Sequence, residues 1–138
     1  MNVLTLGTFD LFHAGHVNLL ARCRMLAGKR GLVIVALNPD DFITSYKGRP
    51  PVVSYNDRLR VLSACRYVDR VVRGSGRDSK PAIEAVGPDI IAVGSDWESK
   101  DYYGQLGVTS EWLSQQGISI EFLPYTAQIS SSMLRARM

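Results

Sequence analysis

The stretch Gly7-Thr8-Phe9-Asp10-Leu11-Phe12-His13-Ala14-Gly15-His16 decides the fold of this chain. A short apolar run at residues 2–6 leads into it and predicts a β-strand. Apolar residues with helical spacing follow the stretch and predict a helix over residues 14–27, which Gly28 ends. The stretch is therefore expected to be the turn between a buried strand and a helix.

Two imidazoles stand at the start of this predicted helix. Backbone N–H groups at a helix N-terminus lack intrahelical partners and carry a partial positive charge, so they favour an anion. His13 and His16 are the two histidines of the chain, and both can donate hydrogen bonds at the same place. Together these groups predict a phosphate site. The alternative is that both are surface residues and that one of them simply caps the helix.

Four further apolar runs predict strands, and helical patterns separate them. The predicted strands are 32–37, 67–72, 89–94 and 118–123, and the predicted helices are 55–65, 79–87, 110–116 and a last one from residue 130. Residues 42–53 fit neither pattern and are expected to form an exposed loop, and Ser54 with Asp57 resembles a capping box. Strands that alternate with helices predict an α/β fold. We expect a Rossmann-like, doubly wound parallel sheet of five strands with helices on both faces, in a single domain over residues 1–138.

Polar residues follow several of these predicted strands. In a doubly wound sheet the ligand lies outside the carboxyl ends of the strands. The candidate segments at that edge are residues 8–16, the basic pair Lys47 and Arg49, residues 94–97, and residues 126–132. Their convergence predicts one binding site at that edge of the sheet.

Composition and charge exclude several classes of protein. The chain is 46% hydrophobic and 21% charged, which is typical of a soluble globular protein. No apolar run reaches the roughly 20 residues of a membrane span, and the N-terminus lacks a signal-peptide pattern, so we expect a cytoplasmic protein without a membrane partner. The net charge of +3 is spread along the chain, which argues against a nucleic-acid partner. Cys23 and Cys65 are expected to be core residues.

Several motifs resemble those of one enzyme family. His13-Ala14-Gly15-His16 resembles the HxGH signature of the nucleotidyltransferase superfamily, and Gly7-Thr8-Phe9-Asp10 resembles its cytidylyltransferase branch. Residues 54–69, 94–98 and 124–132 are similar to segments of glycerol-3-phosphate cytidylyltransferases. The resemblance implies the strand order 3-2-1-4-5. It also implies attack of a phosphate monoester on the α-phosphate of a nucleoside triphosphate, with release of pyrophosphate.

The resemblance implies roles for individual residues, in three groups. It assigns catalysis to His13, His16, Lys47 and Arg49; nucleotide binding to Gly7, Thr8, Phe9, Asp10, Gly15, Gly94, Asp96, Trp97, Thr126, Ile129, Ser130 and Ser131; and acceptor binding to Arg58, Arg66 and Lys80. A Mg²⁺ ion is expected on the triphosphate, held mainly by the phosphates and not by protein ligands. A homodimer is also expected. The alternative for Arg66 and Lys80 is that both are solvated surface charges, and for the serines that they are an ordinary helix cap.

The chain departs from the family pattern near the base and the acceptor. Tyr125 replaces an arginine, Gln128 a glycine and Ser95 an aspartate, and residues 101–107 are additional. Arg135 or Arg137 is a candidate for the charge missing at Tyr125. The leading hypothesis is a cytidylyltransferase that uses CTP and a small phosphorylated alcohol such as glycerol 3-phosphate.

Two other hypotheses stay open. One is an adenylyltransferase of the same fold that uses ATP, because Ile129-Ser130-Ser131-Ser132 also resembles a motif of that branch. The other is a non-catalytic nucleotide-binding regulatory module, which the departures at Tyr125 and Ser95 motivate.

Overall fold

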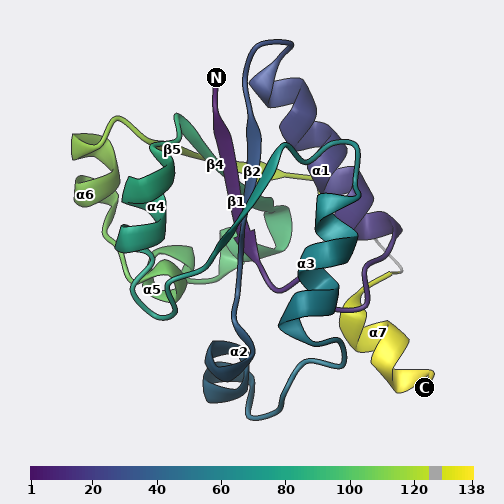
Figure 1. Cartoon of the computed structure of the whole chain (residues 1–138). Coiled ribbons are helices and arrows are strands. Elements are labelled where there is room, and N and C mark those ends of the chain that lie inside the picture. Colours follow the sequence, from purple (N-terminus) through teal and green to yellow (C-terminus); the bar gives the residue numbers. More distant parts are fainter. Residues whose placement is uncertain (125–128) are drawn as a thin grey trace.

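The computed structural model describes residues 1–124 and 129–138 and contains a five-stranded parallel sheet. The strands are β1 (Val3–Gly7), β2 (Val33–Leu37), β3 (Arg70–Arg73), β4 (Ile90–Gly94) and β5 (Ser119–Leu123). Their order across the sheet is β3-β2-β1-β4-β5 (Figure 1). The Rossmann-like fold and the strand order predicted from the sequence are therefore confirmed.

The central strands are apolar because both of their faces are covered. All five residues of β2 are buried, and β1 pairs with β2 from Val3 opposite Val33 and with β4 from Val3 opposite Ile90. Side chains alternate along each strand. Val3 consequently packs into one hydrophobic cluster and Leu4 into a second cluster on the opposite face.

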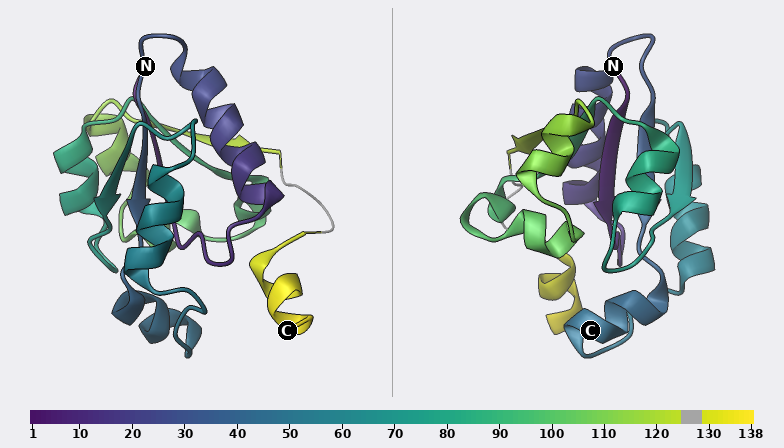
Figure 2. Two further views of the ribbon diagram at one scale, coloured as in Figure 1. Left: turned by 45° about the vertical axis from the view of Figure 1, so that its right-hand side comes forward. Right: turned by 90° about the vertical axis from the view of Figure 1, so that its left-hand side faces the viewer.

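Helices cover both faces of the sheet (Figures 1 and 2). The first cluster packs against α1 (Ala14–Ala27) and α3 (Tyr55–Ser63). The second packs against α4 (Lys80–Val86), α5 (Tyr102–Leu106) and α6 (Ser110–Gln115). The carboxyl ends of the strands point to the end of the molecule that carries α2 (Asp40–Lys47) and α7 (Ser131–Ala136) (Figure 1).

The prediction of a loop over residues 42–53 is wrong for its first half, because α2 extends to Lys47. The helix buries a single residue, Ile43, so its apolar pattern is weak. Acidic residues in its first turn and Gly48 after its last turn are nevertheless ordinary helix signals. Lys47 is therefore the last residue of a helix and does not lie in the middle of a loop.

Two more local features differ from the sequence-based expectations. Ser54 stands at the N-cap of α3, but its side chain makes no capping hydrogen bond, so the predicted capping box is wrong. The Tyr55 N–H instead donates to the Asp40 carboxylate at 3.2 Å. The additional residues 101–107 contain α5, whose first turn is capped by the Asp101 side chain. In the described part of the chain no helix is long and apolar enough to span a membrane.

Candidate active site

The loop between β1 and α1 places two histidine rings at the start of α1. His13 is the N-cap residue, and its Nδ1 accepts the N–H of Gly15 at 3.0 Å. The His16 Nδ1 accepts the N–H of His13 at 3.1 Å. Two histidines thus form the reciprocal cap that a Ser or Thr and a Glu or Gln form in many helices. The capping role considered from the sequence is real, and it involves both rings.

This cap fixes the protonation of both imidazoles. An Nδ1 that accepts a hydrogen bond carries no proton, so the neutral ring carries its proton on Nε2. The two rings are stacked, with centroids 3.8 Å apart, and both line the same cavity. Capping through Nδ1 therefore leaves two neighbouring Nε2–H donors for a ligand.

The two rings are uncharged at neutral pH. Burial, followed by repulsion from His13, lowers the pKa of His16 to about 3 against a smaller raising effect of Asp10. Burial also lowers the pKa of His13. In this structure they are neutral hydrogen-bond donors, and positive charge comes from other residues.

The low pKa of His16 makes folding stability depend on pH. Because the unfolded chain binds a proton near pH 6.5 and the folded chain does not until about pH 3, stability is lost as the pH falls through this range. We expect His16 to account for about 2 kcal/mol of the loss between pH 6.5 and roughly pH 5. Thermal melts at pH 7 and pH 5 should show a smaller loss for His16→Gln than for wild type. Equal losses would contradict the buried, neutral imidazole.

Gly15 is required because the His13 ring covers it. A Cβ atom built at Gly15 lies 2.8 Å from Cε1 of His13, closer than a real contact allows. Alanine stabilises a helix relative to glycine by up to about 1 kcal/mol, and loss of the His13 cap costs about as much, so Gly15→Ala should leave the melting temperature within a few degrees of wild type. The same change should displace His13 and lower kcat by about tenfold or more. Steady-state kinetics and a thermal melt of one preparation test both parts, and unchanged kcat would contradict them.

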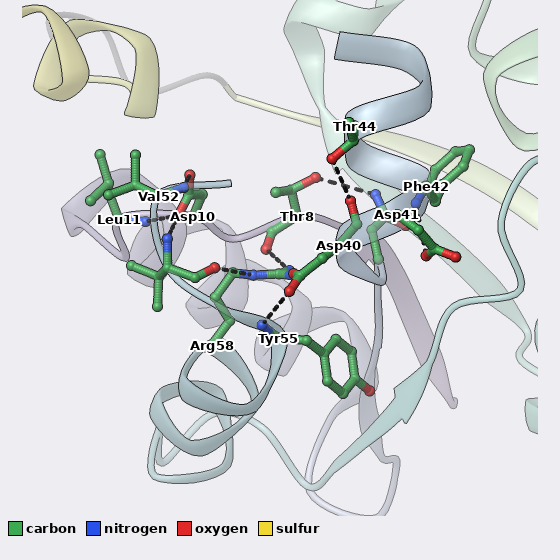
Figure 3. Close-up of polar contacts among 12 residues, drawn as sticks. Thr8, Asp10, Leu11, Asp40, Asp41, Phe42, Thr44, Val52, Tyr55 and Arg58 are labelled. Carbon is green, nitrogen blue, oxygen red and sulfur yellow. Dashed lines mark hydrogen bonds and ion pairs between the residues drawn. The ribbon is translucent and has the colours of Figure 1, made fainter. Parts of the chain in front are cut away.

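Asp10 holds the loop between β1 and α1 against the segment after α2. Its side chain is 2% exposed and accepts the N–H groups of Val52 at 2.8 Å and Val53 at 2.9 Å (Figure 3). Phe9 and Leu11 on either side both have φ of 51°, which is unusual for residues with a side chain. The tightly bent loop is therefore held by the buried Asp10 carboxylate.

Arg58 lies beneath the site and not in it. Its side chain is 1% exposed, and its guanidinium donates to the carbonyl oxygens of Thr8 at 2.8 Å and Val53 at 2.9 Å. The remaining nitrogen pairs with the Asp40 carboxylate at 2.5 Å (Figure 3). The expected contact between Arg58 and the acceptor is not what the structure shows, because this side chain is buried and bound to protein groups. Arg58 joins α2, α3 and the β1–α1 loop.

Positive charge gathers at the mouth of the site. Partial burial, followed by repulsion from Arg135 and Arg49, lowers the pKa of Lys47. Arg135 lies on α7, and its Nη1 is 3.5 Å from the Asp10 carboxylate. Of the two candidates for the charge missing at Tyr125, Arg135 thus lies beside the site. Cations that repel one another this way are stabilised by an anion placed between them.

A cavity of about 370 Å³ opens at the carboxyl ends of the strands. Its volume is within the usual range for small-molecule sites. Most of the residues expected to bind nucleotide or act in catalysis line it: Gly7, Thr8, Phe9, Asp10, His13, Gly15, His16, Lys47, Gly94, Asp96, Trp97, Ile129, Ser130 and Ser131. Ser130 caps α7 through the Met133 N–H, and the Ser131 hydroxyl donates to the Asp10 carbonyl, so both serines also hold α7 in place.

Other predicted site residues lie outside this cavity. Arg49 is exposed near Lys47. Arg66 follows the far end of α3 and lies against the Tyr67 ring. Lys80 lies over the Trp112 ring, which is packed against the second hydrophobic cluster. Thr126, Tyr125 and Gln128 lie outside the described residues.

Sequence reasoning missed or left open three side chains that shape the site. Asp40 was not singled out from the sequence, although the acidic pair Asp40 and Asp41 before an apolar residue is a helix-start signal. Tyr46 extends from α2, and its hydroxyl is 3.2 Å from the Thr8 hydroxyl. Arg135 was one of two candidates, and no local signal distinguishes it from Arg137. Among the described residues no group of three or more His, Cys, Asp or Glu side chains is arranged to hold a metal ion.

The fold and the site define a class of protein. Neutral imidazole donors at a helix N-terminus, a surrounding group of cations and a cavity at the sheet edge are the features of a nucleotide-binding α/β transferase. The chain belongs to the cytidylyltransferase-like family, which matches residues 4–137, and it is a nucleotidyltransferase of the HxGH superfamily.

Proteins similar to this chain agree with that assignment. It is 33% identical over 138 residues to a FAD synthase of Korarchaeum cryptofilum, covering 98% of this chain and 89% of that protein. It is 39% identical over 136 residues to the bifunctional protein HldE of Halorhodospira halophila, of which it spans only 27%. The crystal structure of a lipopolysaccharide core biosynthesis protein from Thermoplasma volcanium superposes with a TM-score of 0.71 at 26% identity, covering 91% of this chain and 96% of that one.

Proposed function

We propose that the protein transfers the adenylyl group of ATP to a small phosphate monoester and releases pyrophosphate. The observation that carries the choice of ATP is the similarity to a FAD synthase along 98% of the chain. FAD contains an adenylate joined to flavin mononucleotide (FMN), so an enzyme that makes it from FMN transfers an adenylyl group. The run Ile129-Ser130-Ser131-Ser132, which also resembles a motif of adenylyltransferases, supports the same choice.

The chemistry needs alignment and neutralisation of charge more than proton transfer. An oxygen of the acceptor phosphate attacks the α-phosphorus of ATP and forms a new P–O bond. The bond between the α-phosphorus and the oxygen that bridges to the β-phosphate breaks, and pyrophosphate leaves with that electron pair. Because the attacking oxygen is already anionic, no general base is required.

The proposed roles follow from the geometry. The Nε2–H groups of His13 and His16 donate to phosphate oxygens as negative charge shifts toward the leaving group. Lys47 and Arg135, with Arg49 nearby, offset the charge of the pyrophosphate. Asp10 and Arg58 are positioning residues, which hold the loop and α2 so that these groups converge.

Mg²⁺ remains part of the proposal as a companion of the triphosphate. The described residues form no cluster that would hold the ion alone, and the Asp10 carboxylate already accepts backbone N–H groups. We propose that the ion is bound chiefly by phosphate oxygens, where it would neutralise their charge. A homodimer is likewise a proposal, which sedimentation of the purified chain tests.

CTP is the second candidate nucleotide. The segment Gly7-Thr8-Phe9-Asp10, which resembles the cytidylyltransferase branch, favours it, and glycerol 3-phosphate would then be the first acceptor to try.

Thermal shift with ATP, CTP, GTP and UTP, each with Mg²⁺, separates these functions. Pyrophosphate release is then measured with FMN, glycerol 3-phosphate and a sugar phosphate as acceptors. We expect selective stabilisation by ATP and turnover with one acceptor. Selective stabilisation by CTP with turnover would replace adenylyl by cytidylyl transfer. Stabilisation without pyrophosphate release for any acceptor would favour a regulatory module.

A further inference from the structure

Three residues along one side of helix α2 attach it to other parts of the protein. In the first turn, the Asp40 carboxylate pairs with the Arg58 guanidinium (Figure 3). In the middle, Ile43 is buried, with 1% of the residue exposed. In the last turn, the Tyr46 hydroxyl lies 3.2 Å from the Thr8 hydroxyl. Residues three positions apart are neighbours on a helix surface, so these three attachments follow one side of α2 from its start to its end.

The last turn of α2 has little other support. Residues 44–50 are all exposed. Within the part of the chain that the structure describes, the contact between Tyr46 and Thr8 is the one hydrogen bond that joins this stretch to another element. Lys47 directly follows Tyr46 and is the last residue of the helix. The Tyr46 hydroxyl therefore makes the hydrogen bond that fixes the end of α2 from which Lys47 extends.

The Thr8 hydroxyl is itself fixed at the edge of the sheet. Asn38 directly follows β2, and its side-chain Nδ2 donates to Thr8 Oγ1 at 3.3 Å. The Asn38 N–H donates to the Gly7 carbonyl at 2.9 Å, which holds this residue beside the end of β1. Since Thr8 Oγ1 accepts from Asn38, its own proton is available for Tyr46 Oη. Three side chains thus form a continuous series of hydrogen bonds from the ends of β1 and β2 to the last turn of α2.

Lys47 needs this support because other cations repel it. Its Nζ lies 5.7 Å from the centroid of the Tyr46 ring. Its pKa is lowered first by partial burial and then by repulsion from Arg135 and Arg49. Like charges move apart when the chain that carries one of them is free to move. A fixed last turn of α2 keeps Lys47 at the cavity that the two histidines line, in place before an anion binds.

We propose that Tyr46 is a positioning residue of the nucleotidyl transfer. Its hydroxyl, held by Thr8 and Asn38, fixes the last turn of α2 and so directs Lys47 toward the leaving pyrophosphate. Tyr46 acts through Lys47 and makes no contact with the reacting atoms. The proposal rests on the proposed function, because it takes the pyrophosphate of a nucleoside triphosphate as the group that Lys47 stabilises.

The first test compares Tyr46→Phe with Tyr103→Phe. Tyr46→Phe keeps the aromatic ring, which packs against Phe42 with 4.9 Å between centroids, and removes only the hydroxyl. The control removes the same group from a tyrosine of α5 that is 39% exposed, against 38% for Tyr46. Pyrophosphate release is measured with the nucleotide and acceptor that support turnover. We expect Tyr46→Phe to lower kcat about tenfold with an unchanged KM for the acceptor, and Tyr103→Phe to change neither.

A double mutant separates positioning from direct contact. Lys47→Met keeps an unbranched apolar stem, removes the ammonium group and should lower kcat by more than Tyr46→Phe does. If Tyr46 acts through Lys47, adding Tyr46→Phe to Lys47→Met lowers kcat no further. If the Tyr46 hydroxyl contacts the substrate itself, the two losses multiply and the proposal is wrong.

Binding of inorganic pyrophosphate with Mg²⁺, measured by isothermal titration calorimetry, gives a readout without turnover. The probe is the product itself, so the result does not depend on which nucleotide or acceptor the enzyme uses. We expect Tyr46→Phe to raise the Kd about threefold to tenfold when Lys47 is present, and to have no effect in Lys47→Met. Tyr103→Phe should leave the Kd unchanged. Because Tyr46 is exposed, the melting temperature of Tyr46→Phe should stay within about 2 °C of wild type.

Three results would overturn the proposal. They are an unchanged kcat or Kd in Tyr46→Phe, a wild-type protein that does not bind pyrophosphate, and a fall of about 5 °C or more in the melting temperature of Tyr46→Phe. The last would show that the hydroxyl acts on folding stability and not on Lys47. Pyrophosphate binding that depends on both Tyr46 and Lys47, without turnover of any triphosphate, would support the positioning role and contradict the proposed function.

Discussion

His16→Asn is expected to lower kcat by about 10²–10³-fold while the protein stays folded. The Oδ1 atom of asparagine takes the place of Nδ1 and can accept the His13 N–H, so the cap of α1 is kept. Asparagine has no atom at the position of Nε2, so the donor to the phosphates is lost. The cost is that of removing one preorganised hydrogen-bond donor to a developing charge.

His16→Gln is the matched comparison for this prediction. Its amide nitrogen lies near the position of Nε2, so it keeps a donor at the phosphates and should retain more activity than His16→Asn. Pyrophosphate release at saturating substrates measures kcat, and a thermal melt reports the fold. A folded His16→Asn protein with kcat within about threefold of wild type would show that the Nε2–H group does not act in the reaction.

Arg58→Met is expected to destabilise the protein by about 3 kcal/mol, which is roughly 10 °C in melting temperature for a chain of this length. The change preserves an apolar stem but removes three hydrogen bonds. It leaves the carbonyl oxygens of Thr8 and Val53 without donors and removes the partner of the Asp40 carboxylate. Asp40 is 44% exposed and can be solvated, which keeps the loss at the low end for a buried ion pair.

Activity of Arg58→Met should also fall, because Arg58 holds the β1–α1 loop against the start of α2. Arg60→Met is the control, since Arg60 lies on the same helix and is exposed. Urea denaturation gives the free energy of unfolding, and kinetics below the melting temperature give kcat. Equal stability of the two variants would contradict the buried position of Arg58. Loss of acceptor affinity without loss of stability would restore the acceptor-binding role expected from the sequence.

The sequence predicted the strand, turn and helix around the two histidines well because these residues are adjacent in the chain. His13 and His16 are three residues apart, and their helix start was predicted correctly at Ala14. The sequence did not predict that both rings cap the helix through Nδ1, because serine, threonine, aspartate and asparagine are the usual signals for a cap. That bonding pattern, with the burial of the rings, makes them neutral donors.

Charged residues were predicted less well than apolar ones. Arg58 and Arg66 look alike in the sequence, and both were expected at the acceptor. In the structure Arg58 is buried in an ion pair, whereas Arg66 is exposed against Tyr67. An arginine becomes buried when other segments supply its partners, and here Thr8 and Asp40 lie outside α3. The sequence of α3 alone therefore does not show which of its arginines is buried.

By itself the sequence determined the five strands, most of the helices and the parallel sheet, because each depends on residues close together in the chain, but it did not predict α2 or α5. The tertiary structure decided which cations face the site and how they are held. Arg58 pairs with Asp40 across 18 positions, and it reaches Thr8 across 50. Arg135 meets Asp10 across 125 positions. Contacts over such separations exist only once the sheet has assembled, so local patterns do not encode them.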